Sequence, residues 1–110
     1  MNERKKKMKV RNIINKNGNA VPNQFIIKGG EYYATFQSYD STVAIFSGHG
    51  LELGKNWDYS NTTMRHLYNF FQEYQIPLHN SKEVRKAIKD GFFTYPNGIK
   101  IPVTYDSELC

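Results

Sequence analysis

The length, composition and charge of the chain exclude several classes of protein. Its 110 residues can bury the core of one domain without disulfides, and the single cysteine, Cys110, has no partner for an internal bridge. No apolar run approaches the roughly 18 residues that a membrane helix needs, and no apolar signal-peptide core follows the basic N-terminus. We expect a protein of a reducing cytoplasm that neither spans a membrane nor is secreted.

The net charge of +5 is concentrated near the N-terminus. Residues 1–16 carry seven basic side chains and one acidic side chain, a charge of +6, whereas the rest carries eight basic and nine acidic ones, a charge of −1. A terminal block of like charges usually stays solvated and poorly ordered, although it can also track the phosphates of nucleic acid. We expect a flexible basic arm at residues 1–9, a single α+β domain at 10–105 and a frayed tail at 106–110.

Short apolar segments separated by turn residues predict strands in the first half of the chain. We expect them at residues 10–14, 24–28, 32–38, 42–46 and 51–53. The third segment carries aromatic rings on both of its faces, among them Tyr32 and Tyr33, and Tyr39 follows it. Exposed rings on a sheet can stack on nucleic-acid bases, so Tyr33 and Tyr39 are candidate partner-binding residues.

The longest periodic stretch predicts one long helix between Trp57 and Tyr74, capped by Ser60 or Asn61. Its apolar side chains recur at spacings of three and four residues and predict one buried face. That face consists of Met64, Leu67, Phe70, Phe71 and Tyr74. The side chains expected in solvent are Arg65, His66, Asn69, Gln72 and Glu73.

A second, shorter helix is expected after Pro77, which cannot continue the first. Asn80 or Ser81 is the predicted cap, with Glu83 at the capping-box position if Asn80 is the cap, and Gly91 ends the helix. Its basic residues recur at helical spacing and predict a strip along one face. The strip consists of Lys82, Arg85, Lys86 and Lys89. It is either an ordinary solvated face or a surface for nucleic acid or an acidic protein.

The end of the chain predicts a hairpin, because residues 92–95 and 99–104 flank the turn Pro96-Asn97-Gly98. Pro102 favours an edge position for the second of these strands. The elements follow one another as strands, helices and strands without regular alternation. This order predicts an α+β fold, with an antiparallel sheet of five or six short strands covered by one long and one short helix.

No motif carries recognisable catalytic or metal-binding chemistry. The histidines His49, His66 and His79 are isolated, and the sequence has no HExxH, paired CxxC or glycine-rich phosphate loop. Ser47-Gly48-His49-Gly50 could flank a base with glycines, but an exposed histidine in a turn is the simpler interpretation. We expect no catalytic residue, no metal, no cofactor and no enzymatic activity.

Three motifs stand out beyond their physical roles: Gln24-Phe25-Ile26-Ile27, Phe36-Gln37-Ser38-Tyr39, and Trp57-Asp58-Tyr59-Ser60 followed by Thr62-Thr63. Together they resemble small proteins carried by bacteriophages and other mobile elements of Gram-positive bacteria. The resemblance covers about half of the chain and implies no catalytic residues. We interpret these motifs as scaffold, with Phe25, Ile27 and Val43 in the sheet core and Trp57 and Tyr59 docking the start of the long helix.

The resemblance implies a protein that acts by binding. Small phage proteins commonly block a host machine, and anti-CRISPR proteins are a frequent case. We therefore expect a non-enzymatic inhibitor in the cytoplasm of the bacterial host, which binds an RNA-guided nuclease or its guide RNA complex. The alternative is a nucleic-acid-binding accessory or regulatory protein that uses the basic arm and the exposed rings. A homodimer through Tyr33 and Tyr68 is also open.

Overall fold

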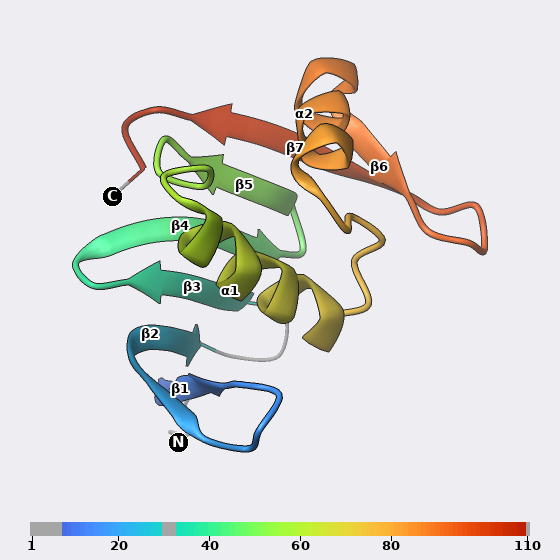
Figure 1. The fold of residues 1–110 in the computed structure, drawn as a ribbon. Coiled ribbons are helices and arrows are strands. Elements are labelled where there is room, and N and C mark those ends of the chain that lie inside the picture. The colour runs from blue at the N-terminus through green and yellow to red at the C-terminus, as the bar shows by residue number, and fades with distance from the viewer. Residues whose placement is uncertain (1–7, 30–32, 110) are drawn as a thin grey trace, which may run out of the picture.

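A computed structural model describes residues 8–29 and 33–109, which form one seven-stranded sheet with both helices on the same face (Figure 1). The strands are β1 (Lys9–Ile14), β2 (Ala20–Lys28), β3 (Tyr33–Ser38), β4 (Ser41–Ser47), β5 (Gly50–Gly54), β6 (Phe92–Thr94) and β7 (Lys100–Asp106). The helices are α1 (Asn61–Glu73) and α2 (Ser81–Asp90). The order of the strands across the sheet is β1-β2-β3-β4-β5-β7-β6. No helix among the described residues is long and apolar enough to cross a membrane.

The α+β class is confirmed, but the predicted five- or six-stranded, purely antiparallel sheet is wrong. The β5 and β7 strands pair in parallel, with Leu51 opposite Val103. Both helices lie in the chain between these two strands, and a connection of that length can return the chain to the same end of the sheet. Each of the seven strands, including the three-residue β6, coincides with a segment that the residue pattern marks as extended, so the count of five or six was too low.

Pro102 does not place its strand at an edge, since β7 lies between β5 and β6. The parallel ladder with β5 begins at Val103, whose backbone N–H donates instead toward Gly91 on the β6 side. Pro102 lies opposite Phe92 in the antiparallel ladder with β6 but precedes the parallel ladder with β5, so its missing N–H removes no donor from the pairing with β5.

The core fills the space between the helices and the sheet. The Phe36 ring of β3 stacks on the Phe70 ring of α1, with 6.0 Å between their centroids. The predicted cap is confirmed, because the Ser60 side chain accepts a 3.0 Å hydrogen bond from the Thr63 N–H. The expectation that His66 faces solvent is wrong. His66 is only 8 % exposed, and it faces the β1–β2 turn, whose residues Asn15 to Asn17 line the same hollow of the surface.

The α2 helix has the predicted boundaries. The Asn80 side chain accepts from the Glu83 N–H at 2.9 Å, and Gly91 ends the helix in the left-handed conformation with φ 84°. The helix packs on β6 and β7 through Val84 and Ala87, which are both buried.

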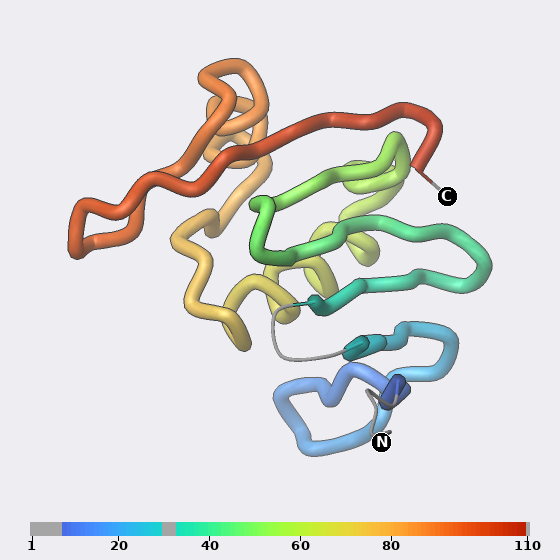
Figure 2. Tube along the Cα trace, turned by 180° about the vertical axis from the view of Figure 1, so that it is seen from behind, coloured from blue at the N-terminus to red at the C-terminus, as the bar shows by residue number. Residues whose placement is uncertain are grey.

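The other face of the sheet carries no helix within the described residues (Figure 2). Ile26 pairs with Phe36 in the core, so strand alternation turns its neighbours Phe25 and Ile27 to this open face, where they are half-buried. Their predicted place in the core is therefore wrong, whereas that of Val43 is confirmed. Trp57 is buried at the start of α1 as expected, but Tyr59 is 76 % exposed and does not dock the helix.

The predicted flexible segments fall mainly at the limits of the described chain. Residues 1–7 of the basic arm, Tyr32 of the third strand and the terminal Cys110 lie outside the described residues. The first strand already begins at Lys9, and the last one extends through Asp106.

Candidate functional site

The four predicted basic residues of α2 form one exposed surface, which we call the α2 strip. It consists of Lys82, Arg85, Lys86 and Lys89, all of which are exposed. Val84 and Ala87 on the opposite side of the helix are buried against the sheet, so the strip faces away from the core.

Two of the four charges in the α2 strip have acidic partners. The Arg85 guanidinium lies 3.3 Å from the Asp58 carboxylate and 5.3 Å from the centroid of the Trp57 ring. The Lys86 ammonium lies 2.6 Å from the Asp90 carboxylate. Lys82 and Lys89 form no ion pair with any described residue. The strip thus keeps an excess of positive charge, and its exposed ion pairs contribute little to folding.

The structure does not bring the two predicted tyrosines together. Tyr33 begins β3 and is 42 % exposed, whereas Tyr39 follows the other end of the strand and is 63 % exposed. Six strand residues separate their backbones by about 20 Å. The α2 strip belongs to a helix that packs on β6 and β7, so these predicted residues do not make one continuous site.

Tyr39 lies instead beside a smaller pocket at the start of α1. Its backbone is held in the left-handed region with φ 52°, and its N–H donates to the Asn23 carbonyl at 2.7 Å. The pocket has a volume of about 310 Å³, and Tyr59 and Thr63 also line it. The ring of Tyr39 is therefore presented by a fixed turn rather than by the strand itself.

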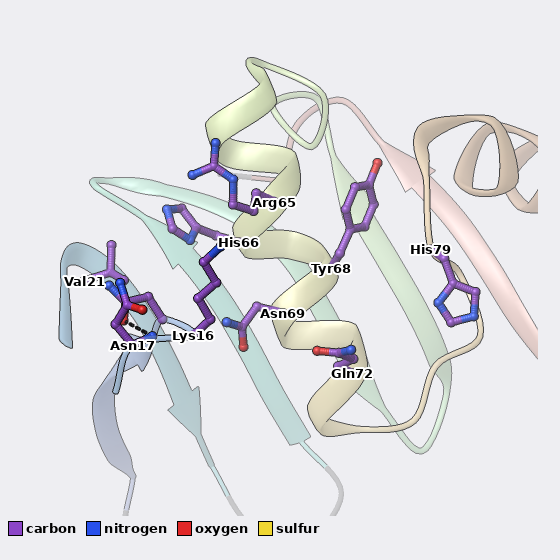
Figure 3. A pocket seen from close by; sticks show the side chains of 10 residues that line it. Lys16, Asn17, Val21, Arg65, His66, Tyr68, Asn69, Gln72 and His79 are labelled. Atoms are coloured by element: carbon purple, nitrogen blue, oxygen red, sulfur yellow. Dashed lines mark hydrogen bonds between the residues drawn. The ribbon is translucent and has the colours of Figure 1, made fainter. Parts of the chain in front are cut away.

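A larger groove, which sequence analysis did not predict, crosses the outer surface of α1 (Figure 3). We call it the α1 groove. Its volume is about 920 Å³. Arg65, Asn69 and Gln72 of α1 form its floor, and Lys16 of the β1–β2 turn and His79 after the helix lie on its two sides.

The α1 groove is positively charged. Lys16 and Arg65 are cationic, and none of the described residues that line the groove is a carboxylate. The pKa of the His66 imidazole is lowered from its ordinary value of 6.5, first by burial and second by the nearby Arg65 guanidinium. His66 is therefore neutral near pH 7 and presents one donor and one acceptor nitrogen.

Hydrogen bonds hold the β1–β2 side of the α1 groove against its floor. The Asn69 side-chain amide donates to the Ile14 carbonyl of β1 at 3.0 Å. In the adjoining turn the Asn15 side-chain oxygen accepts from the N–H groups of Asn17 and Asn19 at 2.9 and 3.0 Å. These bonds fix the turn against α1, so the groove is largely formed before any ligand arrives.

Tyr68 also lines the α1 groove. The pKa of its phenol is raised, mainly by burial, while the charge of Arg85 lowers it and the charge of Asp58 raises it. The α1 groove and the α2 strip belong to different helices, which both cover the same face of the sheet.

The described residues include no group of three His, Cys, Asp or Glu side chains that could hold a metal ion. The exposed basic side chains, amides and rings of these surfaces offer charge, hydrogen bonding and ring contact, which are suited to binding.

The comparisons with known proteins identify a family and no characterised relative. No curated protein and no solved structure matches the chain at a significant level. A family model of unknown function matches residues 8–91, which include the α1 groove and the α2 strip but end before β6 and β7. The chain belongs to this family of unknown function, DUF8033.

Proposed function

We propose that the protein is an anti-CRISPR-like inhibitor of phage or mobile-element origin that binds an RNA-guided nuclease in the cytoplasm of its bacterial host. The observation that carries the proposal is the α2 strip, in which four basic side chains face away from the core and two of them have no acidic partner among residues 8–29 and 33–109. In this proposal the protein acts by occupying a surface and carries out no reaction.

The α2 strip suits contact with an anionic surface of the guide RNA complex. Lys82 and Lys89 are exposed, and no carboxylate in the described part of the chain must be displaced before they meet a phosphate or an acidic side chain. Arg85 is held over the Trp57 ring, which reduces the side-chain freedom that it would lose on binding. Charge of this kind also accelerates the encounter with an anionic partner.

The test is co-purification of the tagged protein with guide-loaded and guide-free nuclease from the host. We expect retention on the guide-loaded form, and we expect Lys82→Glu with Lys89→Glu to weaken it by about tenfold or more, because the reversed charges repel the anionic surface. Lys28→Glu with Lys55→Glu is the matched control, since it changes the net charge equally at exposed lysines outside α2. Equal retention of the two double variants, or no retention of the unaltered protein, would refute the proposal.

A nucleic-acid-binding accessory or regulatory protein is the second candidate, favoured by the cationic α1 groove. The salt dependence of the binding affinity separates the two candidate functions. Neutralising several phosphates makes affinity fall steeply with ionic strength, whereas a mainly protein-based interface responds weakly. A gel shift on plain nucleic acid at physiological salt, without retention on the nuclease, would support this second candidate.

A further inference from the structure

We propose that the α1 groove binds a short single-stranded segment of nucleic acid across the outer face of α1. This site is distinct from the α2 strip, and the inference depends neither on that strip nor on the nuclease.

The charges that line the α1 groove favour an anionic ligand. Lys16 and Arg65 reach the groove from different elements, the β1–β2 turn and α1, and the lining that the structure describes contains no carboxylate. Both side chains are exposed, and neither forms an ion pair with a described residue. Two such cations can each meet one phosphate of a chain that lies across the helix.

Side chains that can form hydrogen bonds with base edges also line the α1 groove. The side-chain amides of Asn17 and Gln72 make no hydrogen bond within the described structure, although both line the groove. Each amide offers a donor and an acceptor, which is the pattern that base edges require. The neutral His66 ring offers the same pair, and His79 adds a second imidazole at the far side.

The shape of the α1 groove also suits a single strand. A volume of about 920 Å³ lies near the upper end of the range for ligand pockets, so the groove can take more than one nucleotide. Its floor is the convex surface of a helix, across which an extended, flexible chain can bend. A duplex keeps the Watson–Crick edges of its bases paired, whereas a single strand can turn these edges toward the amides and imidazoles of the groove. An acidic peptide could use the two cations, but it has no comparable need for the amides and imidazoles.

The test is fluorescence anisotropy with labelled single-stranded oligonucleotides of about eight residues, made as RNA and as DNA, and with the corresponding duplexes. We expect the single strands to bind more tightly than the duplexes, and the RNA and DNA arms to show which sugar is preferred. Lys16→Gln and Arg65→Gln should each raise Kd by about tenfold. Each should also reduce the slope of log K against log salt by about 0.7, the value for one phosphate on a single strand.

Lys89→Gln is the matched control, because it removes an exposed, unpaired lysine from the neighbouring α2 strip. It should leave oligonucleotide binding unchanged. The inference is overturned if no single strand binds at low salt, if duplexes bind equally well, if Lys89→Gln weakens binding as much as the groove variants, or if a polyglutamate peptide displaces the oligonucleotide at equal concentration.

The same variants separate this inference from the proposed function. If Lys16→Gln and Arg65→Gln lose oligonucleotide binding but still co-purify with the nuclease, the groove is an independent site. If the double variant of the α2 strip no longer binds the nuclease but still binds the oligonucleotide, the two binding activities belong to separate surfaces, and each proposal can fail without the other.

Discussion

His66 is a polar side chain that is nearly buried beneath the α1 groove, and this position makes the stability of the fold dependent on pH. Its pKa is lowered in the folded state, first by burial and then by Arg65, while Lys16 adds a second cation on the other side of the groove. The unfolded chain therefore takes up a proton at a higher pH than the folded chain does. The contribution of neutral His66 to the free energy of unfolding is fully present above about pH 6.5. It is lost as the pH drops through that value toward the lower pKa of the folded state.

We predict that His66→Gln removes this component of the pH dependence. The free energy of unfolding, measured by urea denaturation between about pH 8 and pH 5, should fall more steeply below pH 6.5 in the unaltered protein than in the variant. Each unit by which the pKa is lowered contributes about 1.4 kcal/mol to the difference. The other histidines and the carboxylates are common to both proteins, so parallel profiles would contradict the prediction.

The burial of His66 depends on a contact that apolar periodicity does not indicate. Apolar periodicity correctly identified Leu67, Phe70 and Phe71 as buried. Periodicity places His66 in solvent because histidine is polar, whereas the burial of His66 depends on where the β1–β2 turn lies against α1. That contact joins residues that are far apart in the sequence, such as Ile14 and Asn69, so the pattern of neighbouring residues does not indicate it.

At the scale of elements, the helix ends are the features that sequence predicts best, because a cap is made by residues within one turn of each other. Both predicted caps form, at Ser60 and Asn80. At the second cap the Glu83 carboxylate also accepts from the His79 N–H at 2.7 Å, so residues on both sides of Asn80 are tied to the first turn of α2. The orientation of the α2 strip depends on this anchored start.

We predict that Asn80→Ala lowers the free energy of unfolding by about 1 kcal/mol, because the Glu83 N–H loses its acceptor. Urea denaturation measures the change. Asn61→Ala is the control, since Asn61 is exposed at the first position of α1 and its side chain forms no hydrogen bond in the described structure. An equal loss in the two variants would show that the cap contributes nothing specific.

At the scale of the whole molecule, the place of β7 beside β5 decides the architecture and was not predictable from local patterns. The turn at residues 96–98 correctly indicated a β6–β7 hairpin, but a hairpin can join a sheet by either of its strands. The choice depends on close approach between distant segments. Gly50 permits this approach, because a Cβ at that position would lie 2.5 Å from the Pro102 carbonyl oxygen.

We predict that Gly50→Ala destabilises the whole fold. The new methyl group would press on the β7 backbone, and φ at this residue is +120°, a conformation that alanine rarely adopts. We expect a loss of about 2 kcal/mol or more, which lowers Tm by roughly 8 °C or more in a domain of this size. Gly48→Ala is the matched control in the same turn, because nothing lies within 4 Å of its Cβ position. A similar Tm for the two variants would contradict the role given to Gly50.

The parallel pairing of β5 with β7 has a consequence for how the chain is made. On the ribosome, β1 to β5 emerge first and can pair successively through short turns, whereas the partner of Leu51 is synthesised roughly fifty residues later, at Val103. Until then the β5 edge has no strand beside it. During translation the nascent sheet therefore presents an open edge to other chains, and the arrival of β7 closes it.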